Sequence, residues 1–266
     1  MKKMITILCL LGFFSPGIFL QADVYVKGIM HIAGGYRLGH IVPDIDAVNE
    51  WWFAEDKVTF ITSGWYLEFM DTNWRFTLDK EKKRILVVNL NKKTYTEVSL
   101  EKDPLFYVEP QVVKILPAYH RDGTVIKKEE KKNFFDKTCD VYQVLEWLME
   151  VDLRTDERER IIYVTTDVPF NWRLFNELFQ WIRSYHSPYP TYVSQLQTIE
   201  GFIVKFDETF LPRGGRQEWD FKVLEISRKE APGNIYDIPG DYKALEKFST
   251  RDIFDLDSVV YPNPIY

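Results

Sequence analysis

The sequence predicts a mainly β protein of the α+β class, built on one antiparallel sheet that is strongly curved or partly closed, with helices on its concave side. The first observation is a regular series of short apolar and β-branched segments separated by turn residues. The second is one strongly amphipathic stretch, residues 167–185, with the periodicity of a helix. The third is the order of the segments, which runs strands, a crossing segment, strands, a helix and strands again.

The first 22 residues have the pattern of a secretory signal peptide. Lys2 and Lys3 precede a nearly continuous apolar run, residues 4–14, and a small residue, Ala22, offers a cleavage site. The alternative is a membrane anchor, but Ser15-Pro16-Gly17 interrupts the apolar run. We therefore expect export to the periplasm or beyond, with no transmembrane segment in the mature chain. We expect one β domain from residue 23 to 250, followed by a tail from 251 to 266.

Composition excludes some classes of partner. The chain has 34 basic and 40 acidic residues, and cleavage would remove two lysines and no acid. An acidic exported protein is a poor candidate for binding nucleic acid or anionic membrane surfaces by charge. Cys139 would be the one cysteine left, so no internal disulfide is expected, and neighbouring Val141 and Val144 favour a buried structural thiol over a nucleophile.

The first half of the mature chain predicts a meander of short strands. Alternation and turn residues place these strands at residues 23–33, 50–53, 57–62, 65–70, 74–78, 84–89 and 94–99. The glycine-containing stretch 34–46 is predicted as a loop, and residues 90–93 as the turn of a hairpin between the last two strands.

The second half predicts more strands around the helix. Residues 104–116 are expected to form a short helix or an irregular crossing segment, Asp122-Gly123 a tight turn, and 154–160 a solvated, charged turn. The strands are expected at residues 124–128, 138–149, 161–166, 201–206 and 217–227. Residues 192–198 suggest another helical turn, and the proline-containing tail suggests poor packing.

The helix predicted at residues 167–185 has an unusually wide apolar face. Asp167 is a suitable N-cap, Pro169 is tolerated in the first turn, and Pro188 lies just past the end. Its apolar side chains are Phe170, Trp172, Leu174, Phe175, Leu178, Phe179, Trp181, Ile182 and Tyr185. They spread over roughly 180°, whereas a surface helix needs only about 100°. We therefore expect this helix either to pack deeply against a strongly curved sheet or to cover a ligand.

The C-terminal third resembles the LolA/LolB superfamily of periplasmic lipoprotein carriers, and most closely its uncharacterised secreted relatives. The similarity is carried by a strand ending in Asp167-Val168-Pro169, the central Gly201-Phe202 strand, a strand at residues 223–226, and the closing Pro239-Gly240-Asp241-Tyr242. Residues 94–97 and 139–142 also lie in the expected places.

This resemblance implies a half-open β-barrel, with helices plugging an apolar cavity that can hold acyl chains. The chain lacks a lipidated cysteine of the membrane-anchored LolB type, because Cys9 comes too early in the apolar run. No arginine of this sequence matches the carriers' functional arginine, so no binding residue is carried over. A shared fold is not by itself a functional assignment.

No catalytic or metal-binding motif is found in the sequence. His31, His40, His120 and His186 lack ligand companions, and the acids near His40 (Asp44, Asp46 and Glu50) suggest an exposed loop. The glycines of residues 34–39 do not have dinucleotide-binding spacing. The eight tryptophans suggest core or cavity lining more than sugar or base stacking. We therefore expect no catalytic residue, no cofactor and no metal.

The sequence thus predicts a non-enzymatic, exported carrier or binder of a lipid or a lipoprotein acyl chain. The expected ligand-binding residues all lie on the helix, and they are Trp172, Phe175, Leu178, Phe179 and Ile182. The alternative is an envelope module with a packed core that binds another protein, through a free strand edge or through the tail, which contains Val259-Val260-Tyr261.

Overall fold

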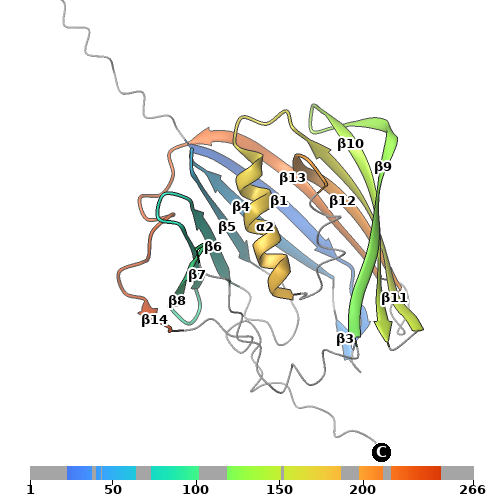
Figure 1. The fold of residues 1–266 in the computed structure, drawn as a ribbon, viewed down its shortest axis with the longest axis horizontal. Helices are drawn as coiled ribbons and strands as arrows, with labels where there is room; N and C mark the ends of the chain where they lie inside the picture. The colour runs from blue at the N-terminus through green and yellow to red at the C-terminus, as the bar shows by residue number, and fades with distance from the viewer. Residues whose placement is uncertain are drawn as a thin grey trace, which may run out of the picture.

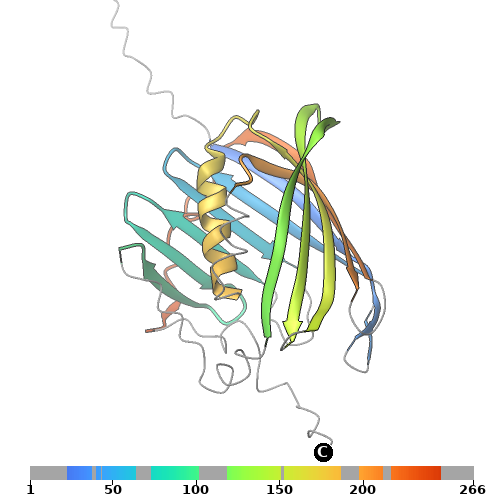
Figure 2. The same ribbon diagram turned by 45° about the vertical axis from the view of Figure 1, so that its right-hand side comes forward.

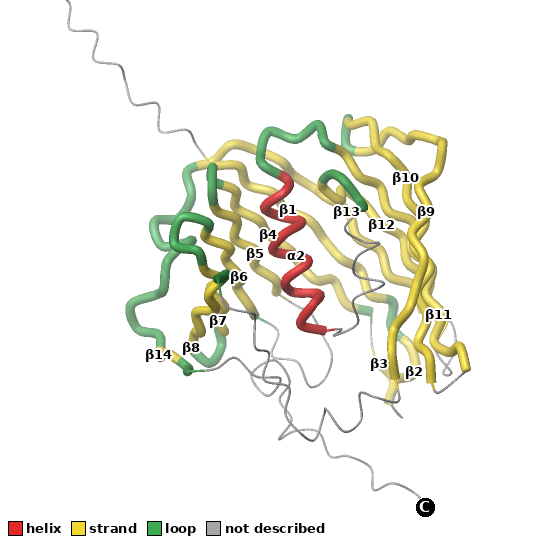
Figure 3. The backbone as a smooth tube through the Cα atoms, viewed as in Figure 1, coloured by secondary structure: helices red, strands yellow, loops and turns green. Residues whose placement is uncertain are grey.

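The computed structural model describes residues 23–37, 40–42, 44–63, 73–101, 119–150, 153–186, 198–211 and 217–246. These residues form fourteen strands and one α-helix (Figures 1 and 3). The strands are β1 (Asp23–Ile32), β2 (Gly35–Arg37), β3 (His40–Val42), β4 (Ile45–Phe53), β5 (Lys57–Ser63), β6 (Trp74–Asp79), β7 (Arg84–Asn89), β8 (Thr94–Ser99), β9 (Tyr119–Phe134), β10 (Lys137–Glu150), β11 (Leu153–Thr165), β12 (Phe202–Leu211), β13 (Gln217–Lys229) and β14 (Lys243–Ala244). The helix is α2 (Trp172–His186).

Twelve strands form one sheet in the order β14-β8-β7-β6-β5-β4-β1-β13-β12-β11-β10-β9, and β2 and β3 form a separate hairpin. All neighbours in the large sheet are antiparallel except β14 and β8, which are parallel. The sheet therefore consists of two meanders, β4 to β8 and β9 to β13, which β1 joins by pairing with β4 on one side and β13 on the other. This confirms the predicted meander in the first half of the chain and the β7–β8 hairpin.

The sheet is curved, and α2 lies on its concave side. Figure 2 shows the helix standing in front of the sheet, between the strands of the first meander and the long strands β9 to β11. The large sheet is open, since β9 and β14 are its two edges. Among the described residues, the strands therefore do not show the barrel that the family resemblance implies, and one helix, rather than several, covers the concave face.

The helix begins five residues later than predicted. Asn171, and not Asp167, acts as its cap, because the Asn171 Oδ1 atom accepts a hydrogen bond of 3.2 Å from the backbone N–H of Arg173. Asp167 is exposed and pairs with Lys137 across the sheet at 3.0 Å. Phe170 precedes the helix, yet its ring stacks on Phe53 with centroids 3.9 Å apart, so the entry segment is anchored to the sheet.

The convex face is covered by a segment that we call the strap, residues 231–246, which runs from the end of β13 to the β8 edge (Figure 1). Ile235 of the strap is buried beside Tyr25 and Trp52. The buried guanidinium of Arg75 donates to the backbone oxygens of Asn234, at 3.0 Å, and Asp237. The strap is therefore held by backbone acceptors as well as by apolar contact.

Several local predictions are wrong. The predicted loop at 34–46 contains the β2–β3 hairpin and the first residues of β4. Asp122-Gly123 lies inside β9, and the predicted charged turn at 154–160 is part of β11. Residues 1–22, 65–70, 104–116, 251–266 and most of 192–198 lie outside the described residues.

Removing the Arg75 side chain should loosen the strap. Arg75→Leu removes the two hydrogen bonds that the buried guanidinium donates to the strap, so we expect a loss of about 3 kcal/mol of unfolding free energy in urea denaturation. Limited proteolysis should then cut first within residues 231–246. As a control, Lys82→Ala removes the exposed Lys82–Asp237 pair of 3.1 Å and a longer contact of 4.0 Å with Asp79, and it should cost less than about 1 kcal/mol. Equal losses in the two variants would contradict this role of Arg75.

Candidate ligand-binding face

The concave face of the sheet has a broad apolar surface that we call the floor. It consists of the buried, inward-facing apolar side chains of β7, β6, β5, β4, β1, β13 and β12. These are Val24, Val26, Met30, Ile32, Ala47, Trp51, Phe53, Val58, Phe60, Trp74, Phe76, Leu78, Ile85, Val87, Phe202, Val204, Phe221 and Val223. Cross-strand register aligns them in rows, so that Phe60 lies opposite Trp51 and Trp51 opposite Val26. Alternation within each strand therefore produces one continuous face.

Aromatic rings dominate the centre of the floor. The Trp51 ring stacks on Phe60 with centroids 5.3 Å apart and meets the edges of Phe202, at 6.0 Å, and Phe221, at 5.7 Å. Gly28 makes the Phe221 contact possible, because a Cβ atom at position 28 would lie 2.4 Å from the Phe221 ring. The absent side chain lets this ring pack against β1.

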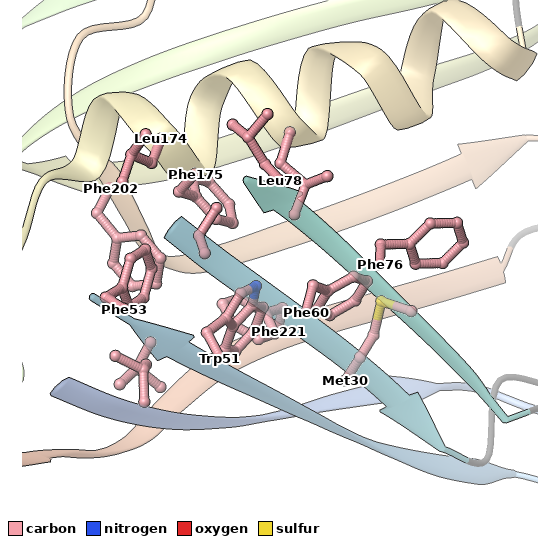
Figure 4. Packing of buried hydrophobic residues seen from close by; sticks show 14 of the residues in the cluster. Met30, Trp51, Phe53, Phe60, Phe76, Leu78, Leu174, Phe175, Phe202 and Phe221 are labelled. Carbon is pink, nitrogen blue, oxygen red and sulfur yellow. The ribbon is translucent and has the colours of Figure 1, made fainter. Parts of the chain in front are cut away.

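One side of α2 packs directly on the floor. Leu174, Phe175 and Leu178 are buried, and the centroid of the Phe175 ring lies 4.8 Å from that of Phe202 and 6.2 Å from that of Trp51. Figure 4 shows Leu174 and Phe175 above Phe202 and Trp51, with Met30 and Phe76 of the floor set apart from them. The helix therefore covers one part of the floor through side-chain packing.

The structure places the five predicted ligand-binding residues in different surroundings. Phe175 and Leu178 are buried against protein side chains. Trp172 and Phe179 are half-buried at the border of the core; the Arg173 guanidinium lies 4.7 Å from the Trp172 ring, and Phe179 stacks on Phe175. Ile182 belongs to α2, but its side chain lies outside the described residues. The sequence prediction missed the sheet residues opposite the helix, although their alternation was visible.

Charged side chains lie on the same face beyond the floor. Glu208 of β12 has a side chain that is only 1% exposed, and it accepts a hydrogen bond of 2.5 Å from Arg160 Nε. Arg158 Nη1 lies 3.6 Å from the same carboxylate, and its guanidinium stands over the Trp219 ring. These arginines belong to the segment predicted as a solvated turn. They are largely buried because alternate residues of β11 point inward.

Titratable groups elsewhere are paired within the protein. Asp56, Asp79 and Glu81 bring carboxylate oxygens within 4.8 Å of one another, but Lys57 Nζ already lies 3.1 Å from Glu81 and 3.7 Å from Asp79. His31 pairs with Asp46 at 2.9 Å, and this hydrogen bond raises the pKa of His31 above its ordinary value. Asp46 lies in β4 and not in the predicted loop, and Glu50 lies in the same strand, as the strand predicted at residues 50–53 implied.

Cys139 is fully buried, as the sequence predicted, and burial raises the pKa of its thiol. A thiol with a raised pKa is a weak nucleophile at neutral pH. A hollow of about 450 Å³ lies nearby at the β9–β10 turn, lined by Asn133, Phe134, Phe135, Asp136 and Thr138. None of the predicted ligand-binding residues lines it.

Among the residues that the structure describes, no helix combines the length and apolar character required to cross a bilayer. No protein-family model matches the chain. No curated protein matches it either.

Among solved structures, the chain is similar to the crystal structure of a DUF1329 family protein from Desulfovibrio piger. The TM-score is 0.28 and the sequence identity 9%, over 82% of this chain and 90% of that one. The similarity is too distant to support a conclusion about function, and the resemblance to the LolA/LolB superfamily stays a prediction.

The packing predicts different roles for two phenylalanines of α2. Phe175→Ala should cost about 3–5 kcal/mol of unfolding free energy in ligand-free protein, because it opens a cavity against Trp51 and Phe202. The half-buried neighbour provides the matched variant, and Phe179→Ala should cost less than half as much, because solvent already reaches part of its ring. Urea denaturation measures both. A smaller loss in Phe175→Ala than in Phe179→Ala would contradict the packing described here.

The buried carboxylate of Glu208 should matter more for stability than any exposed one. Glu208→Ala leaves two largely buried guanidinium groups without their shared acceptor, so we expect a loss of about 3–5 kcal/mol. The exposed Lys83–Glu101 pair, at 2.7 Å, serves as the control, and Glu101→Ala should change stability by less than about 1 kcal/mol. Thermal and urea unfolding at neutral pH measure the difference, and similar losses would show that Glu208 is not needed to neutralise the arginines.

Proposed function

We propose that this chain is an exported, non-enzymatic binding protein that holds a lipid or another acyl-bearing ligand on the concave face of its sheet. The observation that carries this proposal is the width of the floor relative to the helix that lies on it. The proposal includes cleavage of residues 1–22 and a periplasmic location. It also includes a half-open, LolA/LolB-like arrangement of sheet and helix around the ligand.

The floor is much wider than one helix. Its apolar side chains come from seven adjacent strands, which at about 4.8 Å per strand extend over roughly 29 Å. A helix with its side chains has a diameter of about 10 Å. α2 can therefore shield only part of the floor, and Met30 and Phe76 lie away from its labelled contacts (Figure 4). This remaining area supports a site for an extended apolar ligand beside the helix.

Hydrocarbon burial alone can supply the affinity for such a ligand. Each methylene transferred out of water contributes about 0.8 kcal/mol, so an acyl chain of sixteen carbons yields on the order of 10 kcal/mol before the cost of association. Met30, Ile32 and Trp74 are all more than nine-tenths buried. A ligand therefore reaches them only by displacing what lies over them, as expected for a carrier that opens to load.

A second candidate function is protein binding through the β9 edge. β9 is sixteen residues long and pairs only with β10 among the described strands, so its other side can accept a partner strand. Its exposed side chains include lysines and glutamates, such as Lys131 and Glu130, which are typical of edges protected against pairing. The edge therefore supports this function less strongly than the floor supports ligand binding.

Natively purified protein should carry lipid. We expect mass spectrometry of protein extracted from its host's envelope without detergent to detect a bound acyl species that organic solvent removes. Phe76→Ala, on the floor, should reduce the amount bound several-fold, whereas Leu224→Ala, on an exposed position of the opposite face, should not. Consistent absence of lipid, together with no uptake of a fluorescent fatty acid by the purified protein, would refute the proposal.

A further inference from the structure

Two neighbouring polar atoms on the concave face have no hydrogen-bond partner. They are the Asn49 Oδ1 atom of β4 and the Thr62 Oγ1 atom of β5. Their side chains belong to residues that are 4% and 7% exposed, and the two residues lie directly opposite each other in the antiparallel register. Directly opposed side chains have Cβ atoms about 5 Å apart, so one small polar group can reach both.

The lack of partners is unusual at this depth, because nearly all buried polar atoms in proteins are hydrogen-bonded. Two of the other buried oxygens without a hydrogen bond have a cation beside them, and the third, Thr96 Oγ1 of β8, is a single neutral hydroxyl. Glu208 Oε1 lies 3.6 Å from Arg158, and Asp79 Oδ2 lies 3.7 Å from Lys57. Asn49 and Thr62 are neutral, and an ion pair cannot stabilise them. Their unmet hydrogen-bonding capacity is therefore a cost to the ligand-free protein.

The pair lies within the aromatic part of the floor. Along β4 and β5 the next inward-facing residues are Trp51 and Phe60, whose rings stack. Trp74 of β6 lies opposite Thr62, and Gly28 of β1 lies opposite Asn49. A polar group that met Asn49 and Thr62 would thus have apolar surface around it. That combination suits a polar linkage attached to a hydrocarbon chain.

We infer that Asn49 and Thr62 form a polar subsite that recognises an amide or hydroxyl group at the head of an acyl chain. An N–H or O–H of the ligand would donate to Asn49 Oδ1, and the Thr62 hydroxyl would donate to the ligand's carbonyl or accept from its donor. A fatty amide offers a donor and an acceptor together, so it complements both residues. A fatty ester offers only acceptors and leaves Asn49 Oδ1 unsatisfied. This inference rests on the proposed function and names its ligand class.

The subsite makes a prediction about stability that needs no ligand. β5 carries two buried threonines with opposite hydrogen-bonding states, since the Thr59 hydroxyl bonds to that of Thr77 at 2.8 Å on the other face. Thr62→Val removes an unsatisfied hydroxyl at nearly constant volume and should raise the midpoint of thermal unfolding by about 2 °C or more. Thr59→Val removes the hydrogen-bond partner of the Thr77 hydroxyl and should lower the midpoint of thermal unfolding.

The binding experiment compares oleamide with methyl oleate, two probes with the same hydrocarbon chain, on delipidated full-length protein. Displacement of a fluorescent fatty acid gives the two dissociation constants. The wild type should bind oleamide at least about tenfold more tightly, because only the amide satisfies both side chains. In Asn49→Leu the preference should fall to near unity, because Asn49 Oδ1 is the acceptor that the ester leaves unsatisfied. Thr62→Val should weaken the binding of both probes, because both have a carbonyl that the hydroxyl can meet, and Thr62→Ser, which keeps the hydroxyl, should bind both as the wild type does.

The outcomes distinguish a failure of the proposed function from a failure of the polar subsite. If neither probe binds the wild type, the proposed function fails and the subsite with it. If both probes bind equally, the function stands and the subsite is refuted. If the amide preference persists in Asn49→Leu, or if Thr62→Val leaves the binding of both probes unchanged, the head group is recognised elsewhere and the inference is also refuted. A water bound permanently to Asn49 Oδ1 and Thr62 Oγ1 would also make the two probes bind equally, because neither probe would then reach these atoms.

Discussion

The pairing of β1 with two strands at once is the constraint on which the rest of the structure depends. β1 hydrogen-bonds to β4 on one side and to β13 on the other, so the first strand of the described chain joins the two meanders into one sheet. Without it, β4 to β8 and β9 to β13 would each have an additional free edge. Gly28 marks the centre of this junction, because its missing side chain lets the Phe221 ring of the second meander pack against β1 and Trp51 of the first.

Once the sheet is joined, its two faces are completed in different ways. On the convex face, the strap supplies backbone oxygens to Arg75, and the hydroxyls of Thr59 and Thr77 bond to each other. On the concave face, a single helix lies on a floor several times its width, and Asn49 and Thr62 keep polar atoms without partners. On the convex face the buried atoms without a hydrogen bond, such as Arg75 Nε and Asp79 Oδ2, belong to charged groups, whereas the neutral pair Asn49 and Thr62 lies on the apolar, concave face. This difference between the faces is the reason for proposing the site on the concave side.

Local patterns in the sequence predicted much of this fold, and the failures have physical causes. The hairpin around residues 90–93 and the strands of both meanders follow from alternation and turn residues, which act over short distances. The helix start was misplaced because Asp167 has the residue type of a cap, while its side chain pairs with Lys137 of a distant strand. Arg158 and Arg160 alternate with Glu157 and Glu159 at the period of a strand, but their charge suggested solvent. Their shared partner Glu208, which helps to compensate their burial, lies 50 and 48 residues away in the sequence.

The candidate site was less predictable than the fold, because it depends on register between strands. Nothing in the sequence indicates that Asn49 and Thr62 are opposed, and a shift of one residue in the β4–β5 register would turn one of them to the other face. A floor made only of hydrocarbon would avoid both the buried ion group around Glu208 and these unsatisfied atoms, and by that criterion would be more stable. Packing alone gives no reason for a buried amide beside aromatic rings. A ligand that must be recognised by its polar linkage as well as by its chain gives one, because specificity then depends on groups left unsatisfied until it binds.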